Sequence, residues 1–496
     1  MKKTKIVATI GPASESEKTL EKMMKAGMNV ARLNFSHGAH EWHKMAIDRI
    51  RKVAKKNNLN VSILADLQGP RIRVNTKEEI VVKSGAELLL YEVGEVVNTK
   101  NKPFIFLDKK NIASKLKENQ EILIEDGLIK LKVVENKGKY LITKVIDGGT
   151  IKNHKGVNIP GADLDIEIIT PKDRKDLEFS LENDVDFVAI SFVKNGENIR
   201  SLRKLITKKI SDVSKQPKIV SKIERKEAID NLEDILRETD VVMVARGDLG
   251  IEMDESRVVI LQKEIIAKSI HYLKPVIVAT QMLDSMINNP RPTRAEVGDV
   301  SNAVIDHADA VMLSGESANG KYPVEAVEIM GKIIEKTEDS VYDDVHEALE
   351  CETESCAEYV VIVRSAYELA KSFNAQAMCA VSVSGYTAKL ISHFRPTQKI
   401  IVATNNSKSF RQLSILWGVN GYLFKEKKLE TLIDKAVLEA KKDKKLKKGD
   451  KVVVIMGRVV DNEKMRLVGV KRFSHQSKVK SHQSLKLKGA LMTDCR

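Results

Sequence analysis

The sequence predicts an α/β protein whose centre is a (β/α)8 TIM barrel. Eight short runs rich in apolar and β-branched residues alternate with longer amphipathic segments, which is typical of parallel strands separated by helices. Nearly every run ends in polar residues, as barrel strands do where they form an active site. The eight runs are Lys5–Ile10, Val30–Phe35, Val61–Leu67, Phe187–Phe192, Ile219–Glu224, Val241–Arg246, Val276–Gln281 and Ala310–Ser314.

The segments between these runs place apolar residues at helical spacing. Clear examples are Glu17–Ala26, Lys172–Asn183, Lys226–Arg237 and Arg257–Tyr272. One interval breaks the alternation, because more than a hundred residues separate the third run from the fourth.

Residues 70–158, within this interval, contain many short β-like runs separated by Gly and Asn turns. They predict a small β domain inserted into a barrel loop. We therefore expect the barrel to comprise residues 1–69 and 159–335, followed by an α/β domain at 340–473. That last domain has strand-like runs near Ala377–Val383, Ile400–Ala403 and Lys451–Ile455.

Composition limits the cellular setting and the partners. The chain has 496 residues, of which 42% are hydrophobic, and no apolar run approaches the roughly 20 residues that cross a bilayer. We expect a cytoplasmic protein with no membrane partner. The net charge of +14 also suits anionic small substrates.

The basic C-terminal tail is expected to be disordered, because residues 474–496 contain few large apolar groups. Residues 471–496 hold seven Lys or Arg against one Asp. Contact with a polyanion is the alternative, but no aromatic side chain follows Phe473, which argues against nucleic acid as a partner.

Lys222 and Glu224 end the fifth run and share one face of the strand, since side chains alternate along it. Asp248 follows the sixth run, in Arg246-Gly247-Asp248. Two carboxylates on adjacent strands suit Mg²⁺, and a neighbouring lysine can neutralise charge on a transferred phosphoryl group. The alternative is a Lys222–Glu224 ion pair with no catalytic role.

Other polar residues end the remaining runs. Arg32 is a candidate phosphate or carboxylate clamp. Oxygens of nearby residues are candidates for holding a monovalent cation or positioning phosphate. These residues are Asn34, Ser36, Asp66 and Leu67. Thr280 ends the seventh run, although such a hydroxyl often bonds its own backbone, and Ser314-Gly315-Glu316 follows the eighth.

Several ordered motifs are similar to those of the pyruvate kinase family. They are Thr4–Ser14, Ala31–Gly38, Asp66–Arg73, Lys155–Gly161, Ile219–Glu224, Ala245–Gly250, Ala279–Met286, Pro292–Val297 and Met312–Tyr322, with looser matches at Ser384–Ala388 and Arg411–Val419. The resemblance implies a barrel with an inserted β-barrel lid domain and a C-terminal regulatory-type domain. It also implies transfer of a phosphoryl group from phosphoenolpyruvate to ADP with Mg²⁺ or Mn²⁺.

The resemblance implies roles for individual residues. Glu224 and Asp248 would bind the divalent metal, and Lys222 would stabilise the phosphoryl group during transfer. Arg32 and Arg73 would contact phosphate, and Thr280 with the Gly247 and Asp248 backbone would hold the substrate carboxylate. His37, Asn34, Arg73 and Lys155 would lie toward the nucleotide, and Asp126 belongs to the lid. Ser314 and Glu316, with Thr280, are candidates for a water relay that protonates the enolate.

Two further expectations follow from the resemblance. Arg71 occupies a position that is usually Glu in potassium-dependent members and Lys in the others. We therefore expect K⁺ not to be required, because a tethered cation replaces a bound one. The helix after Pro292 lies at subunit contacts in the family, so a homotetramer is expected.

The sequence disfavours two alternative functions. Another Mg²⁺-dependent barrel enzyme acting on pyruvate or phosphoenolpyruvate, such as a lyase or aldolase, is disfavoured by the inserted domain and the residues on the nucleotide side. A non-catalytic regulatory or RNA-binding protein is disfavoured by the complete set of charged residues at the strand ends.

Overall fold

The computed structural model describes residues 2–95, 102–162, 164, 166–342, 354–426, 428–460 and 463–472. Eight parallel strands form a closed barrel in the order β1-β17-β16-β15-β14-β13-β3-β2, which confirms the predicted fold class. Their bounds are β1 Lys5–Thr9, β2 Met28–Asn34, β3 Ser62–Asp66, β13 Phe187–Ile190, β14 Lys218–Ile223, β15 Val241–Ala245, β16 Val276–Ala279 and β17 Ala310–Leu313. Each of the eight predicted runs overlaps one of these strands; β2 and β14 begin one or two residues before the predicted runs.

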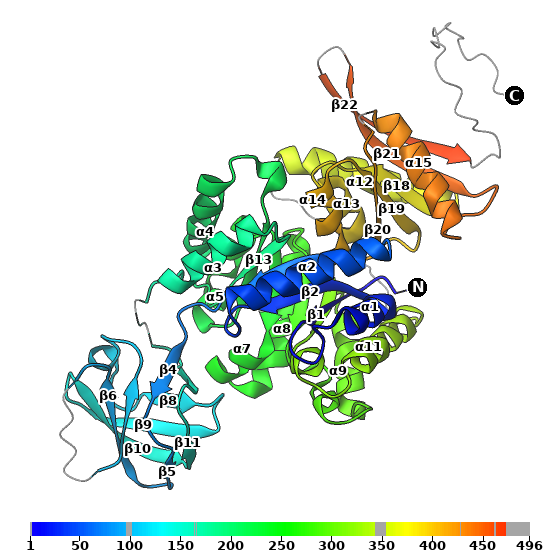
Figure 1. Ribbon diagram of the computed structural model, residues 1–496. Coiled ribbons are helices and arrows are strands. Elements are labelled where there is room, and N and C mark those ends of the chain that lie inside the picture. Colours follow the sequence, from blue (N-terminus) through cyan, green and yellow to red (C-terminus); the bar gives the residue numbers. More distant parts are fainter. Residues whose placement is uncertain are drawn as a thin grey trace, which may run out of the picture.

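Helices surround the barrel and bury their apolar faces against its strands (Figure 1). They are α1 Glu17–Ala26, α2 His40–Lys56, α3 Pro171–Glu182, α4 Gly196–Lys209, α5 Lys226–Asp230, α6 Leu232–Glu238, α7 Arg246–Glu252, α8 Glu255–His271, α9 Arg294–Ile305, α10 Gly315–Ala318 and α11 Pro323–Glu338, with 3-10 turns at Val213–Lys215 and Asp284–Ile287. One prediction needs correction, because Lys226–Arg237 is two short helices rather than one. They meet at Asn231, whose side chain donates a hydrogen bond to the Lys194 carbonyl.

The segment between β3 and α3 forms a second closed barrel, of seven strands. These are β4 Ile72–Asn75, β6 Glu87–Glu92, β7 Phe104–Leu107, β8 Glu121–Ile124, β9 Ile129–Asn136, β10 Tyr140–Asp147 and β12 Gly156–Asn158; β5 Ile80–Val82 pairs separately with β11 Gly149–Ile151, and a 3-10 turn spans Ala113–Lys115. Inward side chains such as Leu88, Leu90, Ile122 and Leu131 give it a core of its own. We call this small barrel the lid.

The C-terminal part is a five-stranded sheet in the order β20-β19-β18-β21-β22, with only β22 antiparallel. Its elements are α12 Glu354–Ser372, β18 Ala377–Val381, α13 Tyr386–His393, β19 Lys399–Thr404, α14 Ser407–Gln412, a 3-10 turn Leu413–Ile415, β20 Val419–Leu423, α15 Leu429–Lys442, β21 Lys451–Val460 and β22 Glu463–Arg472. The lid and this C-terminal domain lie on opposite sides of the large barrel (Figure 1). The basic tail at 474–496 lies outside the described residues.

None of the helices within the described ranges combines the length and apolar character needed to cross a membrane.

Candidate active site

Lys222 lies at the carboxyl end of the barrel among oxygens from three strand ends. Its ammonium nitrogen is 2.7 Å from Glu224 Oε1, 2.9 Å from Ser191 Oγ and 3.5 Å from Asp66 Oδ1. The Lys222–Glu224 ion pair that the sequence left as an alternative is therefore present. It does not stand alone, because Asp66 shares the same ammonium.

The charges of this cluster shift the proton affinities of its members. Burial alone would lower the pKa of Lys222, but the carboxylates of Asp66, Glu224 and Asp248 outweigh burial and raise it, so the ammonium stays protonated. Burial raises the pKa of Glu224; Lys222 opposes this rise and Asp248 adds to it. The site thus concentrates negative charge that a bound cation would stabilise.

Arg32, at the end of β2, is almost entirely buried and has fixed partners. Its Nε and Nη2 both lie 2.7 Å from Asp66 Oδ2, and its Nη1 donates to Thr9 Oγ1 at 2.9 Å. Burial of Asp66 opposes ionisation, yet Lys222 and Arg32 lower its pKa below the usual value. Asp66 is therefore an anion held between two fixed cations.

Two groups that follow β13 orient Lys222 and Glu224. Ser191 Oγ donates to the Leu67 carbonyl at 2.8 Å, which directs its lone pairs toward Lys222. The Phe192 amide donates to Glu224 Oε2 at 2.8 Å. Phe192 has a φ of 57°, in the left-handed region, so the chain turns sharply at this point and presents its amide to the barrel mouth.

Thr280 joins the ends of β15 and β16. Its hydroxyl accepts a hydrogen bond from the Gly247 amide at 2.8 Å and donates to the Ala279 carbonyl at 2.6 Å. The bond to its own backbone, considered from the sequence, therefore coexists with a contact to the loop that carries Asp248. Thr280 has a φ of 71°, which is strained for a β-branched residue and typical of functional sites.

The turn after β17 places Ser314 and Glu316 beside β16. Glu316 is buried and accepts hydrogen bonds from the Ser314 amide at 2.7 Å and the Leu283 amide at 3.1 Å. Burial raises the pKa of its carboxyl despite these donors. Ser314 Oγ is buried and has no hydrogen-bond partner among the described residues. A water molecule is the natural partner for such a hydroxyl.

The loop after β2 carries the predicted nucleotide-side residues. Asn34 Oδ1 accepts from the Ser36 amide at 3.1 Å, so this oxygen closes a local turn. His37 lies at the surface. Its pKa is lowered first by partial desolvation and then by the positive charges of Arg73, Arg71 and Arg32. The arginines of the lid are thus close enough to act electrostatically on a residue of the barrel rim.

The predicted lid residues mostly pair within the lid. Arg73 donates to the His154 carbonyl at 2.9 Å, and Lys155 pairs with Glu125 at 2.5 Å. Arg71 pairs with Asp126 at 3.0 Å. No contact joins Lys155 to the Lys222 cluster among those found in the described residues.

The donor set fits a hard divalent cation. Glu224 directly follows β14, and Asp248 lies in α7, which directly follows the neighbouring strand β15. Carboxylate oxygens are the ligands that Mg²⁺ prefers. Within the described residues, no three His, Cys, Asp or Glu side chains are grouped to hold a metal. A metal bound here would therefore take its remaining ligands from substrate and water.

Sequence reasoning missed Thr9, the partner of Arg32. The signal was available, because Thr9 ends the first apolar run just as Thr280 ends the seventh. The Phe192 amide was also missed, and backbone donors give no side-chain signal in a sequence.

Comparisons with known proteins agree with this geometry. Residues 1–327 match the family model described as pyruvate kinase, barrel domain, and residues 361–466 match pyruvate kinase, alpha/beta domain. Pyruvate kinases of Staphylococcus epidermidis and Staphylococcus aureus are 42% identical to the chain over 463 residues, covering 92% of the chain and 78% of each relative. A crystal structure of a pyruvate kinase from Cryptosporidium parvum superposes with a TM-score of 0.88 at 35% identity, covering 95% of this chain and 96% of that one.

Proposed function

The chain belongs to the pyruvate kinase family and is an enzyme that transfers the phosphoryl group of phosphoenolpyruvate to ADP, and from this premise we propose which of its residues perform the reaction. The observation that carries the proposal is the buried cluster of Lys222, Glu224 and Asp66 at the carboxyl end of the barrel. Barrel enzymes place their chemistry at this end.

Lys222 is proposed to stabilise the phosphoryl group during transfer. Its raised pKa keeps the ammonium charged, and Ser191 and Glu224 fix its position before substrate arrives. A preorganised cation lowers the barrier because it needs no rearrangement as charge develops on the phosphoryl oxygens. Arg32 is proposed to contact the same phosphate, with Arg73 approaching from the lid.

Glu224 and Asp248 are proposed to hold Mg²⁺ or Mn²⁺. When bound, the metal would neutralise phosphate charge and bring substrate oxygens together. Thr280 and the Gly247 and Asp248 amides are proposed to hold the substrate carboxylate. The contact between Thr280 and the Gly247 amide already brings these two donors together.

Ser314 and Glu316 are proposed to take part in protonating the enolate. The Ser314 hydroxyl lacks a protein partner within the described part of the chain, and Glu316 has a raised pKa beside it. Both features suit a relay of water molecules, in which a carboxyl that retains its proton resupplies the chain. Asn34, His37 and Lys155 are proposed to lie toward the nucleotide.

K⁺ is proposed not to be required. Asp66, one of the residues considered for a monovalent site with Asn34, Ser36 and Leu67, already lies between Arg32 and Lys222. Arg71 adds a fixed charge that acts on His37 at the barrel rim. In tetramethylammonium buffer, we expect added KCl to stimulate the rate by less than about tenfold, and a larger stimulation would overturn this assignment.

We also propose the domain limits 1–69 with 159–335, 70–158 and 340–473, a cytoplasmic location and a homotetramer. Support for the tetramer comes from α9, where Arg294, Ala295 and Gly298 are exposed and available for subunit contacts. Sedimentation at several protein concentrations tests this state.

The test of the proposed roles is Lys222→Met assayed with phosphoenolpyruvate, ADP and Mg²⁺. Methionine keeps the length of the side chain and removes the charge. A folded variant that still forms pyruvate at the wild-type rate would remove Lys222 from the reaction. An ADP-dependence of pyruvate formation in the wild type separates this activity from that of a lyase or aldolase.

A further inference from the structure

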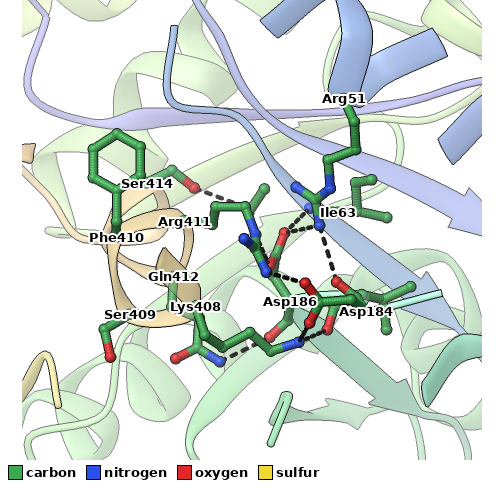
Figure 2. Close-up of polar contacts among 12 residues, drawn as sticks. Arg51, Ile63, Asp184, Asp186, Lys408, Ser409, Phe410, Arg411, Gln412 and Ser414 are labelled. Carbon is green, nitrogen blue, oxygen red and sulfur yellow. Dashed lines mark hydrogen bonds and ion pairs between the residues drawn. The ribbon is translucent and has the colours of Figure 1, made fainter. Parts of the chain in front are cut away.

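The C-terminal domain docks on the amino-terminal end of the barrel, the end opposite to the active site. Helix α14 and the residues after it lie against the loop that precedes β13 (Figure 2). Lys408 donates to Asp184 at 2.7 Å, and Arg411 Nη2 lies 2.6 Å from the other oxygen of the same carboxylate. Asp184 is largely exposed, so this part of the contact is screened by solvent.

Asp186 is different, because its side chain is completely buried. Its Oδ1 accepts from Arg411 Nε at 2.6 Å. Its Oδ2 accepts from the Ile63 amide and from Arg51, both at 2.8 Å. A desolvated carboxylate depends strongly on such partners, so its position follows theirs. Figure 2 shows Arg51, from the barrel, and Arg411, from the C-terminal domain, both pointing toward Asp186.

Asp186 is directly followed by β13, which leads to the active site. The strand is buried along all four of its residues and pairs with β3 and β14. Ser191 and Phe192, which hold Lys222 and Glu224, come directly after it. At the rise of an extended chain, ~17 Å of stiff strand separates Asp186 from Ser191.

A second arginine of the C-terminal domain makes the same kind of contact. Arg395 Nη2 lies 3.2 Å from Asp309, which directly precedes β17 and accepts from the Val276 amide at 2.9 Å. Strand β17 leads to Ser314 and Glu316. The domain therefore holds the starting residues of two strands whose ends carry active-site groups.

We propose that Arg411 is a positioning residue for phosphoryl transfer: by binding Asp186 it fixes β13 along its axis, and thereby sets where Ser191 and Phe192 hold Lys222 and Glu224. This inference rests on the roles proposed above for Lys222 and Glu224. Docking of the C-terminal domain then contributes to catalysis although it supplies no group to the site. A shift of β13 would move Ser191 and Phe192 together, and these two residues hold Lys222 and Glu224.

The test compares Arg411→Gln with Arg51→Gln in the full-length protein. Both substitutions remove one cation from the same carboxylate, but Arg51 belongs to α2 of the barrel and Arg411 to the C-terminal domain. Kinetics are measured well below the unfolding temperature, and binding of Mn²⁺ is followed by electron paramagnetic resonance. The melting temperature reports the purely structural effect of each change.

For Arg411→Gln we expect kcat to fall about 3- to 10-fold and Mn²⁺ binding to weaken by about threefold or more. For Arg51→Gln we expect a smaller change, with both quantities within about twofold of wild type, because Arg411 still holds Asp184 and Asp186 from the C-terminal domain. Equal changes in the two variants, or no change in either, would overturn the proposal.

Arg411→Lys covers the case in which Arg411→Gln fails to fold. Lysine keeps the charge but cannot bridge Asp184 and Asp186 as the planar guanidinium does. We expect kcat and Mn²⁺ binding between those of wild type and the values expected for glutamine, and wild-type values for both would overturn the proposal. An active Lys222→Met variant would instead contradict the proposed function, so the two failures are distinguishable.

Discussion

The two ends of the barrel use acidic residues in different ways. At the amino-terminal end, Asp186, Asp240 and Asp309 each directly precede a strand, and each accepts a backbone amide from the start of a neighbouring strand, at 2.8 to 2.9 Å. At the carboxyl end, Asp66 and Glu224 face Lys222, whose ammonium group carries the balancing charge. One end fixes the strands, and the other presents charge to a substrate.

This difference shows that carboxylates of similar chemistry serve different functions at the two ends of the barrel. The carboxylates at the amino-terminal end are bound by backbone amides and by arginines of the fold itself, so their charge is balanced within the protein. The carboxyl-end cluster combines two carboxylates, a lysine and an arginine in a space where a bound cation would lower the energy further. Substitutions at the carboxyl end should therefore act directly on the reaction. Those at the amino-terminal end should act first on stability, and on catalysis only through the strand that they anchor, as proposed for Asp186 and β13.

The largest effect is expected for Lys222→Met at the carboxyl end. Removing a preorganised charge from the transition state should lower kcat by about 10²- to 10³-fold. The melting temperature should also fall, because methionine leaves the buried carboxylates of Asp66 and Glu224 without the ammonium that balances them. A variant whose kcat stays within tenfold of wild type would contradict the distinction between the two ends.

A smaller effect, on stability rather than rate, is expected for Asp240→Asn. Asp240 Oδ2 accepts from the Ile219 amide at 2.9 Å and pairs with Arg203 at 3.1 Å. Burial opposes ionisation of Asp240, but Arg203 and Lys218 lower its pKa overall. We expect a loss of about 1 to 3 kcal/mol, measured by thermal unfolding, with Mg²⁺ dependence unchanged. A changed Mg²⁺ requirement would show that β15 transmits a change at its start to the metal site, as proposed for β13.

The smallest effect is expected for Glu252, which lines a pocket together with Ile72 and Val157 of the lid and whose contribution to stability depends on pH. Burial raises the pKa of Glu252 to about 7, although Arg225 opposes the shift and the Gly161 amide also stabilises the anion. The folded state therefore binds this proton more tightly than the unfolded state does, so stability is greatest at low pH and falls as the pH rises through about 7.

Glu252→Gln removes this titration. Relative to the variant, the wild-type melting temperature should fall by about 2 to 4 °C between pH 5 and pH 8. A difference between the two proteins that is constant across this range would show that Glu252 does not titrate there.

The strands and helices of the large barrel were predicted well from the sequence, because they depend on the local spacing of apolar and polar residues. Alternation along a strand correctly placed Lys222 and Glu224 on one face, and polar run ends correctly marked the carboxyl rim. The break at Asn231 was missed because apolar spacing continues through it. Strand β20 was not predicted either, since Val419-Asn420-Gly421 contains residues that disfavour strands.

The interdomain contacts could not be predicted at all. Arg411 and Asp186 are 225 residues apart, and their pairing depends on how the C-terminal domain packs against the barrel, where one hydrophobic cluster includes residues of both. From residue types alone, Asp186 cannot be distinguished from any other polar residue that precedes a strand. Only the structure distinguishes Asp186, a buried carboxylate that accepts three hydrogen bonds, from Asp184, which is largely exposed.

The most direct test of the central claim is Mn²⁺ binding, followed by electron paramagnetic resonance, to wild type, Glu224→Gln and Asp240→Asn. The account predicts that Glu224→Gln weakens binding by about tenfold or more, while Asp240→Asn binds as wild type does. Wild-type affinity in Glu224→Gln would contradict the assignment of the metal, and with it the proposed division between the two ends of the barrel.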